Sequence, residues 1–332
     1  MEQNENNPYV KQYPDLMSGK KIMYVHGFAS SAQSGTVQRL RTFFPNATVV
    51  AEDIPLHPEE GLAMLRTMAA DERPDLIIGT SMGGMYTEQL YGFDRILINP
   101  AFQIADTMAM HGLTGKQVFQ NPRKDGVQEF FVTKAMVKEY RDIQQQCFSH
   151  QEDRHRVWGL FGDRDDLVHT YPLFMEHYTQ GIWCHGEHRT NDKMFMHSVV
   201  PVIRWIDDRQ EHRERPVAYI HIDALRKSDG LQVSSAMKGF RRLMETFDLY
   251  IVAPTHNYDH DYQKNVLEWA YDVVNVPAWR HVVFTNREDL LIGDFFISPY
   301  EMSSFMGTHV MLGSDTFKTW EEIITYFGRI IS

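Results

Sequence analysis

The sequence predicts an α/β protein in which a parallel β-sheet carries helices on both faces, followed by a second, smaller α/β domain. Three observations favour this fold class. Short apolar runs alternate with amphipathic stretches through the first half of the chain. A serine with glycines on either side directly follows one of these runs, at residues 79–83. A charged stretch that ends in proline, residues 207–216, interrupts the alternation, which then starts afresh.

The apolar runs of the first half have the length of buried strands, and the stretches between them have helical spacing. Strands are expected at residues 20–25, 47–51, 75–79, 95–99, 157–161 and 181–184, and helices at residues 37–44, 59–70, 85–90 and 199–206.

Residues 101–155 break this alternation. The segment is rich in Met, Gln and Lys and contains one helix-like run, residues 132–146. An insertion after a core strand is either a cap over the site or a solvated helical excursion, and the sequence favours neither.

The second half repeats the alternation of strands and helices. Strands are expected at residues 217–222, 249–253, 281–284, 294–297 and 309–312, and helices at residues 235–247, 262–273 and 320–327. We therefore expect a domain of residues 1–209, a linker at residues 210–216 and a second domain of residues 217–332.

Composition excludes several classes of protein. The chain of 332 residues is 43% hydrophobic and 23% charged, as in soluble globular proteins. Its formal charge of −11 argues against non-specific binding to nucleic acids or anionic membranes. The polar start M-E-Q-N-E-N-N-P lacks the features of a signal peptide, and no apolar run reaches the ~18 residues of a membrane helix. Cys147 and Cys184 are too few for a disulfide framework, so we expect reduced thiols in a cytoplasmic protein.

Ser81 has the sequence context of a nucleophile elbow, a tight strand-to-helix turn that exposes a serine hydroxyl. The motif G-T-S-M-G follows an apolar strand and precedes a helix-compatible run. Gly79 and Gly83 stand where a Cβ would clash with the turn. Amides at the start of the following helix suit a developing oxyanion.

A serine nucleophile needs a base, and the base needs an acid that orients it. In enzymes with this elbow the order along the chain is Ser, acid, His. The loop G-D-R-D-D-L-V follows the strand at residues 157–161 and offers the acid. Asp165 is favoured by its position in a G-x-x-D-x-x-V pattern, with Asp163 and Asp166 as alternatives.

His188 is the expected base, because it follows the last strand of the first half in the sequence H-G-E-H. His185, His169 and His197 lie nearby in the sequence. His197 precedes an apolar helical run, which is typical of a helix-start or core histidine.

Two backbone amides are expected to hold the oxyanion. One is that of Met82, the residue after the nucleophile. The other comes from the loop H-G-F-A after the first strand and is expected to be that of Phe28, with Gly27 allowing a close approach of the backbone.

Several of these motifs resemble those of the small YqiA-like esterases of the α/β-hydrolase superfamily. The motifs are Y-V-H-G-F-A-S-S, I-I-G-T-S-M-G-G-M-Y, I-L-I-N-P-A and G-E-H, and the resemblance spans about residues 20–208. It implies an α/β-hydrolase fold and a compact hydrolase of esters or thioesters of small acyl groups, with Ser81 as nucleophile and His188 as base. The acid loop and residues 107–151 depart from the family pattern.

Residues 217–328 resemble the haloacid-dehalogenase (HAD) superfamily, nearest its deoxyribonucleotidase-like branch. The motifs are Y-I-H-I-D-A-L, F-D-L-Y-I-V-A-P-T, K-N-V-L-E-W and G-D-F-F-I-S-P. The resemblance puts His221 in the place of the nucleophilic Asp, while Asp223 and Lys264 remain. Other motif positions also depart from the family: Ala253 stands for the usual Thr, although Thr255 lies two residues on, and Ser298 and Pro299 stand for the acidic pair that holds Mg²⁺. The resemblance therefore implies a domain without phosphatase activity that packs on the hydrolase, self-associates or binds a ligand.

A further cluster, in the sequence T-H-N-Y-D-H-D-Y, contains His256, Asp259, His260 and Asp261. Histidine and aspartate at such spacing can bind a metal. The stretch has no apolar periodicity, however, and is more typical of a solvated loop. We expect no metal and no organic cofactor.

The sequence thus predicts a serine hydrolase that cleaves an ester or thioester of a small acyl group. Its expected partner is this small-molecule substrate, without nucleic acid or membrane, and self-association through the second domain is a further expectation. A non-enzymatic scaffold built on two inherited enzyme folds is the alternative, supported by the departures in the second half. A peptidase of the same fold ranks lower, since no feature indicates a pocket for a peptide amine.

Overall fold

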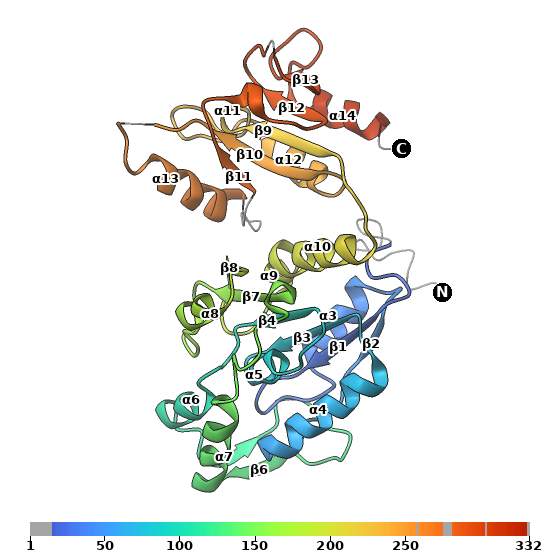
Figure 1. The fold of residues 1–332 in the computed structure, drawn as a ribbon, viewed down its shortest axis with the longest axis vertical. Coiled ribbons are helices and arrows are strands. Elements are labelled where there is room, and N and C mark those ends of the chain that lie inside the picture. The colour runs from blue at the N-terminus through green and yellow to red at the C-terminus, as the bar shows by residue number, and fades with distance from the viewer. Residues whose placement is uncertain (1–14, 257, 275–280, 303, 331–332) are drawn as a thin grey trace. The chain divides into compact units, whose positions relative to one another are not determined.

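The computed structural model describes residues 15–256, 258–274, 281–302 and 304–330. The chain divides into two compact units, Met1–Asp207 and Asp208–Ser332. Each unit contains its own sheet with helices packed against it (Figure 1). The predicted α/β class with parallel sheets is confirmed.

The first unit is built on a six-stranded sheet in which all neighbouring strands are parallel. The strand order is β2-β1-β3-β4-β7-β8. Parallel strands end at the same edge of a sheet, so the loops that follow β3, β7 and β8 come together there. The strands are β1 (Lys21–Val25), β2 (Thr48–Val50), β3 (Leu76–Thr80), β4 (Arg95–Ile98), β7 (Val157–Gly162) and β8 (Gly181–Cys184).

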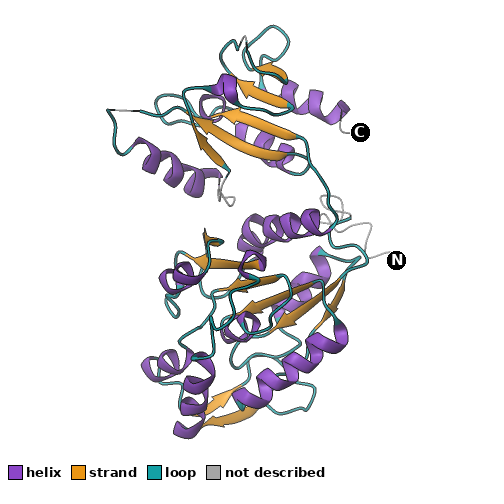
Figure 2. Cartoon of the chain, in the orientation of Figure 1, coloured by secondary structure: helices purple, strands orange, loops and turns teal. Residues whose placement is uncertain are grey.

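Both faces of this sheet are buried, as period-two alternation along the central strands shows. Ile77 and Leu97 belong to one apolar core, which includes side chains of α4 and α5. Their neighbours Ile78 and Ile96 point to the opposite face and are fully buried as well. Figure 2 shows helices on both sides of the sheet. The helices of the unit outside its insertion are α3 (Gly35–Phe43), α4 (Pro58–Glu72), α5 (Met82–Glu88), α8 (Tyr171–His177), α9 (Asp192–Met194) and α10 (Val200–Gln210).

The insertion between β4 and β7 has more structure than the single expected helix. It consists of α6 (Ile104–Met110), an antiparallel hairpin and α7 (Lys134–Gln144). The hairpin strands are β5 (Gly115–Val118) and β6 (Glu129–Val132). In β6, Phe130 and Val132 are buried while Phe131 is exposed, an alternation too short to identify a strand from sequence.

The second unit has a five-stranded parallel sheet in the order β11-β10-β9-β12-β13. β10 and β11 lie on one side of β9, and β12 and β13 lie on the other. The strand order of this doubly wound sheet therefore reverses between β9 and β12. The expected helix at residues 262–273 is α-helical to Trp269 and continues as a π-helical turn, Ala270–Val274. The strands are β9 (Val217–His221), β10 (Asp248–Ala253), β11 (Val282–Phe284), β12 (Phe295–Ser298) and β13 (Thr308–Met311), and the helices are α11 (Ile222–Leu225), α12 (Ala236–Met244), α13 (Tyr262–Trp269) and α14 (Trp320–Ile330).

Two further observations bear on the expectations from composition. Cys147 and Cys184 are buried free thiols. Among the described helices, none combines the length and the apolar character needed to cross a membrane.

Candidate active site

Ser81 occupies the turn between β3 and α5 in a conformation that side chains rarely adopt. Its φ is 56° and its ψ is −122°. Such a backbone is strained for any residue with a Cβ and persists only where the surrounding structure imposes it. Here β3 and α5 hold the turn on both sides, so the hydroxyl stands at the carboxyl edge of the sheet.

Packing around this turn explains the glycines on either side of Ser81. A Cβ on Gly83 would lie 2.6 Å from the carbonyl oxygen of His26. A Cβ on Gly79 would lie 2.6 Å from the carbonyl carbon of Gly83. At Gly27 the added atom would lie 3.3 Å from the Cβ of Ser81, so this loop runs directly beside the serine. Glycine is therefore required at positions 79 and 83 for close approach of the backbone.

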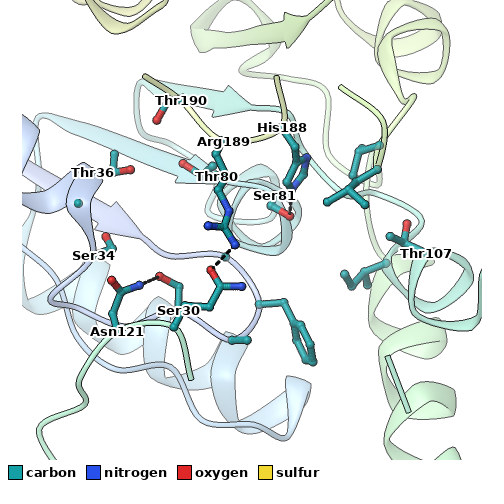
Figure 3. Close-up of a pocket in the computed structure, with 18 of the residues that line it drawn as sticks. Ser30, Ser34, Thr36, Thr80, Ser81, Thr107, Asn121, His188, Arg189 and Thr190 are labelled. Atoms are coloured by element: carbon teal, nitrogen blue, oxygen red, sulfur yellow. Dashed lines mark hydrogen bonds between the residues drawn. The ribbon is translucent and has the colours of Figure 1, made fainter. Parts of the chain in front are cut away.

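Three side chains from the loops after β3, β7 and β8 form a hydrogen-bonded chain. The Oγ of Ser81 lies 3.0 Å from Nε2 of His188, and the two side chains point toward each other in Figure 3. Nδ1 of His188 lies 2.8 Å from Oδ2 of Asp165. This arrangement has the geometry of a nucleophile, a base and an orienting acid.

Asp165 is held as an ionised acceptor. Its Oδ1 accepts hydrogen bonds from the amides of Leu167 and Val168, at 2.9 and 3.0 Å. Desolvation by itself would raise the pKa of Asp165. The hydrogen bond and charge of His188, together with the two amides, outweigh that effect and lower the pKa below 3.8.

The structure separates Asp165 from the other carboxylates of its loop. Asp163 binds a different histidine, with its Oδ2 2.8 Å from Nδ1 of His185, and its Oδ1 accepts from the amide of Gly186 at 3.0 Å. Asp166 is exposed. Asp163 and His185 thus form a second pair, which joins the two loops that carry Asp165 and His188.

The remaining histidines that the sequence offered lie elsewhere. His169 is exposed, and His197 belongs to the π-helical turn Phe195–Val199 that precedes α10. Neither is hydrogen-bonded to Ser81, whose imidazole partner is His188.

The loop expected to supply an oxyanion donor is fixed by a buried histidine. His26 is 2% exposed; its Nε2 accepts from the amide of Ile54 at 3.0 Å, and its Nδ1 donates to the carbonyl of Gly27 at 2.8 Å. These contacts require the neutral imidazole, and burial lowers the pKa of His26 to about 4. Because a trans peptide directs its N–H opposite to its C=O, fixing the Gly27 carbonyl also fixes the Phe28 amide.

The two residues expected to supply oxyanion amides lie close to Ser81 in the chain or in space. Met82 is the first residue of α5, where a helix has no internal acceptor for its N–H. Phe28 lines the same cavity as Ser81, and its ring packs edge-on against Phe130 of β6 at 5.5 Å.

Asn99 links the loops of the site, a role that the sequence did not reveal. Its Oδ1 accepts from the amide of Gly162 at 2.7 Å. Its Nδ2 donates to the carbonyls of Glu187 and His188, both at 3.0 Å. Asn99 is 1% exposed and has a φ of 45°. The only sequence signal is an Asn-Pro pair after a strand, and asparagine tolerates this left-handed backbone better than most residues.

A cavity of about 460 Å³ opens at Ser81. The insertion contributes to the lining of this cavity. Its lining residues from the insertion are Ile104, Thr107, His111, Leu113, Gln117, Val118, Gln120 and Asn121.

In the second unit, His221 lies among carboxylates at the carboxyl end of β9. Its Nε2 lies 3.3 Å from Oε1 of Glu288, and its Nδ1 accepts from the amide of Asp223 at 3.1 Å. The hydroxyl of Tyr300 donates to Oδ2 of Asp223. Ser298 binds the carbonyl of Tyr300 at 2.7 Å.

The four residues of the candidate metal cluster, His256, Asp259, His260 and Asp261, all lie within the described residues, although residue 257 between them does not. His256 packs on the ring of Tyr262 at 4.0 Å, and Asp259 accepts from the amide of Asp261 at 3.1 Å. Within the described part of the chain, no group of three or more His, Cys, Asp or Glu side chains is placed to hold a metal ion.

The chain is similar to several solved structures. One is a methylesterase from Arabidopsis, with 11% identity over 51% of this chain and 91% of that chain and a TM-score of 0.33. A thioesterase domain from the curacin biosynthetic pathway has 13% identity over 51% of this chain and 85% of that chain, with a TM-score of 0.34. The esterase domain of a Rhodothermus marinus protein has 14% identity over 52% of this chain and 79% of that chain, with a TM-score of 0.34. At these identities and TM-scores, no conclusion about substrate follows. No curated protein matches the chain.

A family profile matches the region that contains the whole candidate site. The family is described as "Uncharacterised protein family (UPF0227)", and the match covers residues 21–205. These residues include every strand of the first sheet and nearly coincide with the region that resembles YqiA-like esterases. Since the match extends over more than half of the 332 residues, this protein belongs to the uncharacterised protein family UPF0227.

Proposed function

We propose that the chain is a serine hydrolase that cleaves a carboxylic ester or thioester of a small acyl group through an acyl-enzyme intermediate. The observation that carries the proposal is the hydrogen-bonded chain from Ser81 through His188 to Asp165, at 3.0 and 2.8 Å, at the floor of a cavity. A serine hydroxyl is a poor nucleophile, and this arrangement is the one that activates it.

In the proposed reaction His188 accepts the proton of Ser81 while Oγ attacks the acyl carbon. Asp165 stabilises the imidazolium, and its lowered pKa keeps it ionised in that role. The amides of Met82 and Phe28 stabilise the oxyanion of the tetrahedral intermediate. His188 then protonates the leaving alcohol or thiol. Water, activated by the same base, releases the acid and regenerates Ser81.

The dimensions of the cavity support a small substrate. A volume of about 460 Å³ is at the lower end of the range for small-molecule sites. The resemblance to YqiA-like esterases supports an ester or thioester over a peptide bond.

For the second unit we propose a HAD-like domain that performs no phosphoryl transfer and serves in self-association or ligand binding. The departures from the HAD motifs support this, since His221 stands in the place of the nucleophile. The pairing of His221 with Glu288 supports it further, because that histidine is engaged within the unit.

The decisive experiment measures hydrolysis of p-nitrophenyl esters of increasing acyl length by the wild type and by Ser81→Ala. We expect short esters to be preferred and the substitution to lower kcat by at least about a thousandfold. A fluorophosphonate probe should label the wild type and not the variant. Ester hydrolysis that survives in Ser81→Ala would exclude the proposed mechanism.

The neighbouring carboxylates provide a matched test of the acid. Asp165→Asn should lower kcat by about 10²–10⁴-fold, because the amide no longer stabilises the imidazolium. Asp163→Asn changes the same functional group two residues away and should have a much smaller effect, since Asp163 contacts His185 and not His188. Equal losses of kcat in the two variants would contradict the assignment of Asp165.

A further inference from the structure

The lining of the cavity carries positive charge in an otherwise acidic protein. The formal charge of the chain is −11, yet no Asp or Glu is among the described residues that line the cavity, whereas Arg39 and Arg189 are. Arg39 is paired with Asp192, 2.5 Å from its Nε. Arg189 has a neutral partner instead, because its Nη2 donates to the amide oxygen of Gln120 at 2.9 Å. The charge of Arg189 is therefore not neutralised by a carboxylate within the described residues.

The amino end of α3 opens into the same cavity. Ser34, Gly35 and Thr36 all line it. The carbonyl of Ser34 accepts from the amides of Val37 and Gln38, at 3.1 and 3.3 Å, so the helix is formed from its first turn. The first amides of a helix have no acceptor within the helix, and the helix dipole gives this end a partial positive charge. A helix end of this kind favours an anion.

Ser34 supplies an independent sign of a ligand-binding site. The residue is 5% exposed, and within the described part of the chain its Oγ has no hydrogen-bond partner. It precedes the first residue of α3, yet its side chain does not cap the helix. Leaving a buried hydroxyl unpaired is costly, and a substrate oxygen in the cavity would pair it. In Figure 3, Ser34, Thr36 and Asn121 lie on one side of Ser81, and Thr107 lies on the other.

We propose that the substrate carries an anionic group, a carboxylate or a phosphate, and that Arg189, Ser34 and the amino end of α3 bind it. Apolar side chains of the lining, among them Ile104, Leu113 and Leu167, hold the rest of the molecule. The proposal rests on the proposed ester hydrolysis at Ser81 and specifies its substrate class.

Two pairs of esters test the proposal. Each pair consists of an anionic ester and a neutral ester of matched structure. p-Nitrophenyl hydrogen adipate and p-nitrophenyl hexanoate differ at the end of the acyl chain. 4-(Hexanoyloxy)benzoate and its methyl ester differ in the leaving group. We expect a higher kcat/KM for the anionic member of one of these pairs. The pair that shows this preference identifies whether the acyl chain or the leaving group carries the charge that reaches α3.

The variants test whether the cavity causes this preference. Arg189→Gln should lower the ratio of anionic to neutral kcat/KM by up to about tenfold, chiefly through KM, because Arg189 is exposed and solvent screens part of its charge. Ser34→Ala should lower the ratio too, and it lies far along the chain from His188. Arg66→Gln removes the same charge from an exposed position on α4 and should leave the ratio unchanged. Where the wild type cleaves the esters, the proposal is overturned by equal rates within both pairs, or by a preference that persists in Arg189→Gln and Ser34→Ala.

A binding measurement separates this proposal from the proposed reaction. Calorimetry on Ser81→Ala should detect binding of the uncleaved adipate half-ester, and adding Arg189→Gln should weaken that binding by up to about tenfold. Binding with this pattern supports the anion site even if the wild type cleaves none of the esters, a result that would reject the proposed reaction alone. The anion site is overturned if the half-ester does not bind, or if it binds equally well with and without Arg189. This holds even if neutral esters are cleaved at Ser81.

Discussion

Individual buried side chains hold the loops of the site in place. His26 joins the amide of Ile54 to the carbonyl of Gly27, and Asn99 joins Gly162 to the segment that carries His188. Neither residue contacts Ser81 through a hydrogen bond, so both are positioning residues. Each is more than nine-tenths buried, and an unpaired polar atom there would be costly.

His26 should make stability depend on pH. Burial lowers its folded pKa to about 4, against 6.5 when exposed. Between these values the unfolded imidazole binds a proton and the folded one does not. The free energy of unfolding is therefore at its full value above pH 6.5 and falls as the pH drops toward 4, by roughly 3 kcal/mol. Urea unfolding of the wild type at several pH values between 4.5 and 7.5 measures this fall.

The control for this prediction is His26→Gln, which cannot take up the proton. The variant should be less stable at pH 7.5, because the contacts of His26 are altered, and its stability should fall less steeply toward pH 4.5. Parallel pH profiles for the two proteins would show that His26 is not responsible.

At this scale, the sequence predicted which side chains belong to the site better than it predicted which of them pair with one another. It favoured Asp165 and His188 but left Asp163, Asp166 and three other histidines open. The sequence of a loop gives the spacing of its carboxylates but not the direction in which each side chain points. The folded structure shows that Asp163 pairs with His185 and that Asp165 pairs with His188. The proposed anion-binding role of Ser34 had no sequence signal, since an unpaired hydroxyl is a property of its tertiary surroundings.

At the scale of elements, the backbone of the turn between β3 and α5 is strained at Ser81, the proposed nucleophile. Three groups hold Ser81 at a φ of 56°: the strand before it, the helix after it and the close contacts of Gly79 and Gly83. Strain of this kind costs about 1–3 kcal/mol and is common at functional sites. Relief of the strain should therefore stabilise the fold at the expense of activity.

Ser81→Gly and Ser81→Ala form a matched pair for measuring this strain. Both remove the hydroxyl and should be inactive, but only glycine adopts this backbone without a steric penalty. Glycine also loses more entropy on folding, by about 0.5–1 kcal/mol relative to alanine, which offsets part of the gain. We expect Ser81→Gly to be more stable than Ser81→Ala by about 1 kcal/mol in urea unfolding. If Ser81→Ala is the more stable of the two, the turn is not strained at this residue.

The elements that sequence predicted best are the buried parallel strands. β1, β3, β4 and β7 are runs of apolar residues buried on both faces, and they were expected within about one residue of their observed ends. The edge strand β8, in which Trp183 is exposed, was also expected at its observed residues. The hairpin β5–β6 was missed, because each strand has four residues, β6 buries only one face and β5 contains no buried residue. α8 was also missed, because its seven residues are too few for a helical period to be evident.

At the scale of the whole molecule, the two units differ in what lies at the carboxyl edges of their sheets. In the first unit, side chains at this edge meet around a cavity. In the second, they bind one another: His221 contacts Glu288, and Tyr300 donates to Asp223. In doubly wound sheets this edge is the usual ligand site, so its internal pairing argues against an open phosphate site between β9 and β12.

This contrast predicts that the chain of 332 residues has no Mg²⁺-dependent phosphatase activity. Ser81→Ala, incubated with p-nitrophenyl phosphate and Mg²⁺, should release p-nitrophenol no faster than buffer, since the proposed HAD-like domain has His221 where that family has its nucleophilic carboxylate. The Ser81→Ala background removes any contribution from the first unit. Adding Asp223→Asn should change nothing. Turnover that requires Mg²⁺ and disappears with Asp223→Asn would mean that the second unit retains phosphoryl transfer by a route in which His221 replaces the aspartate.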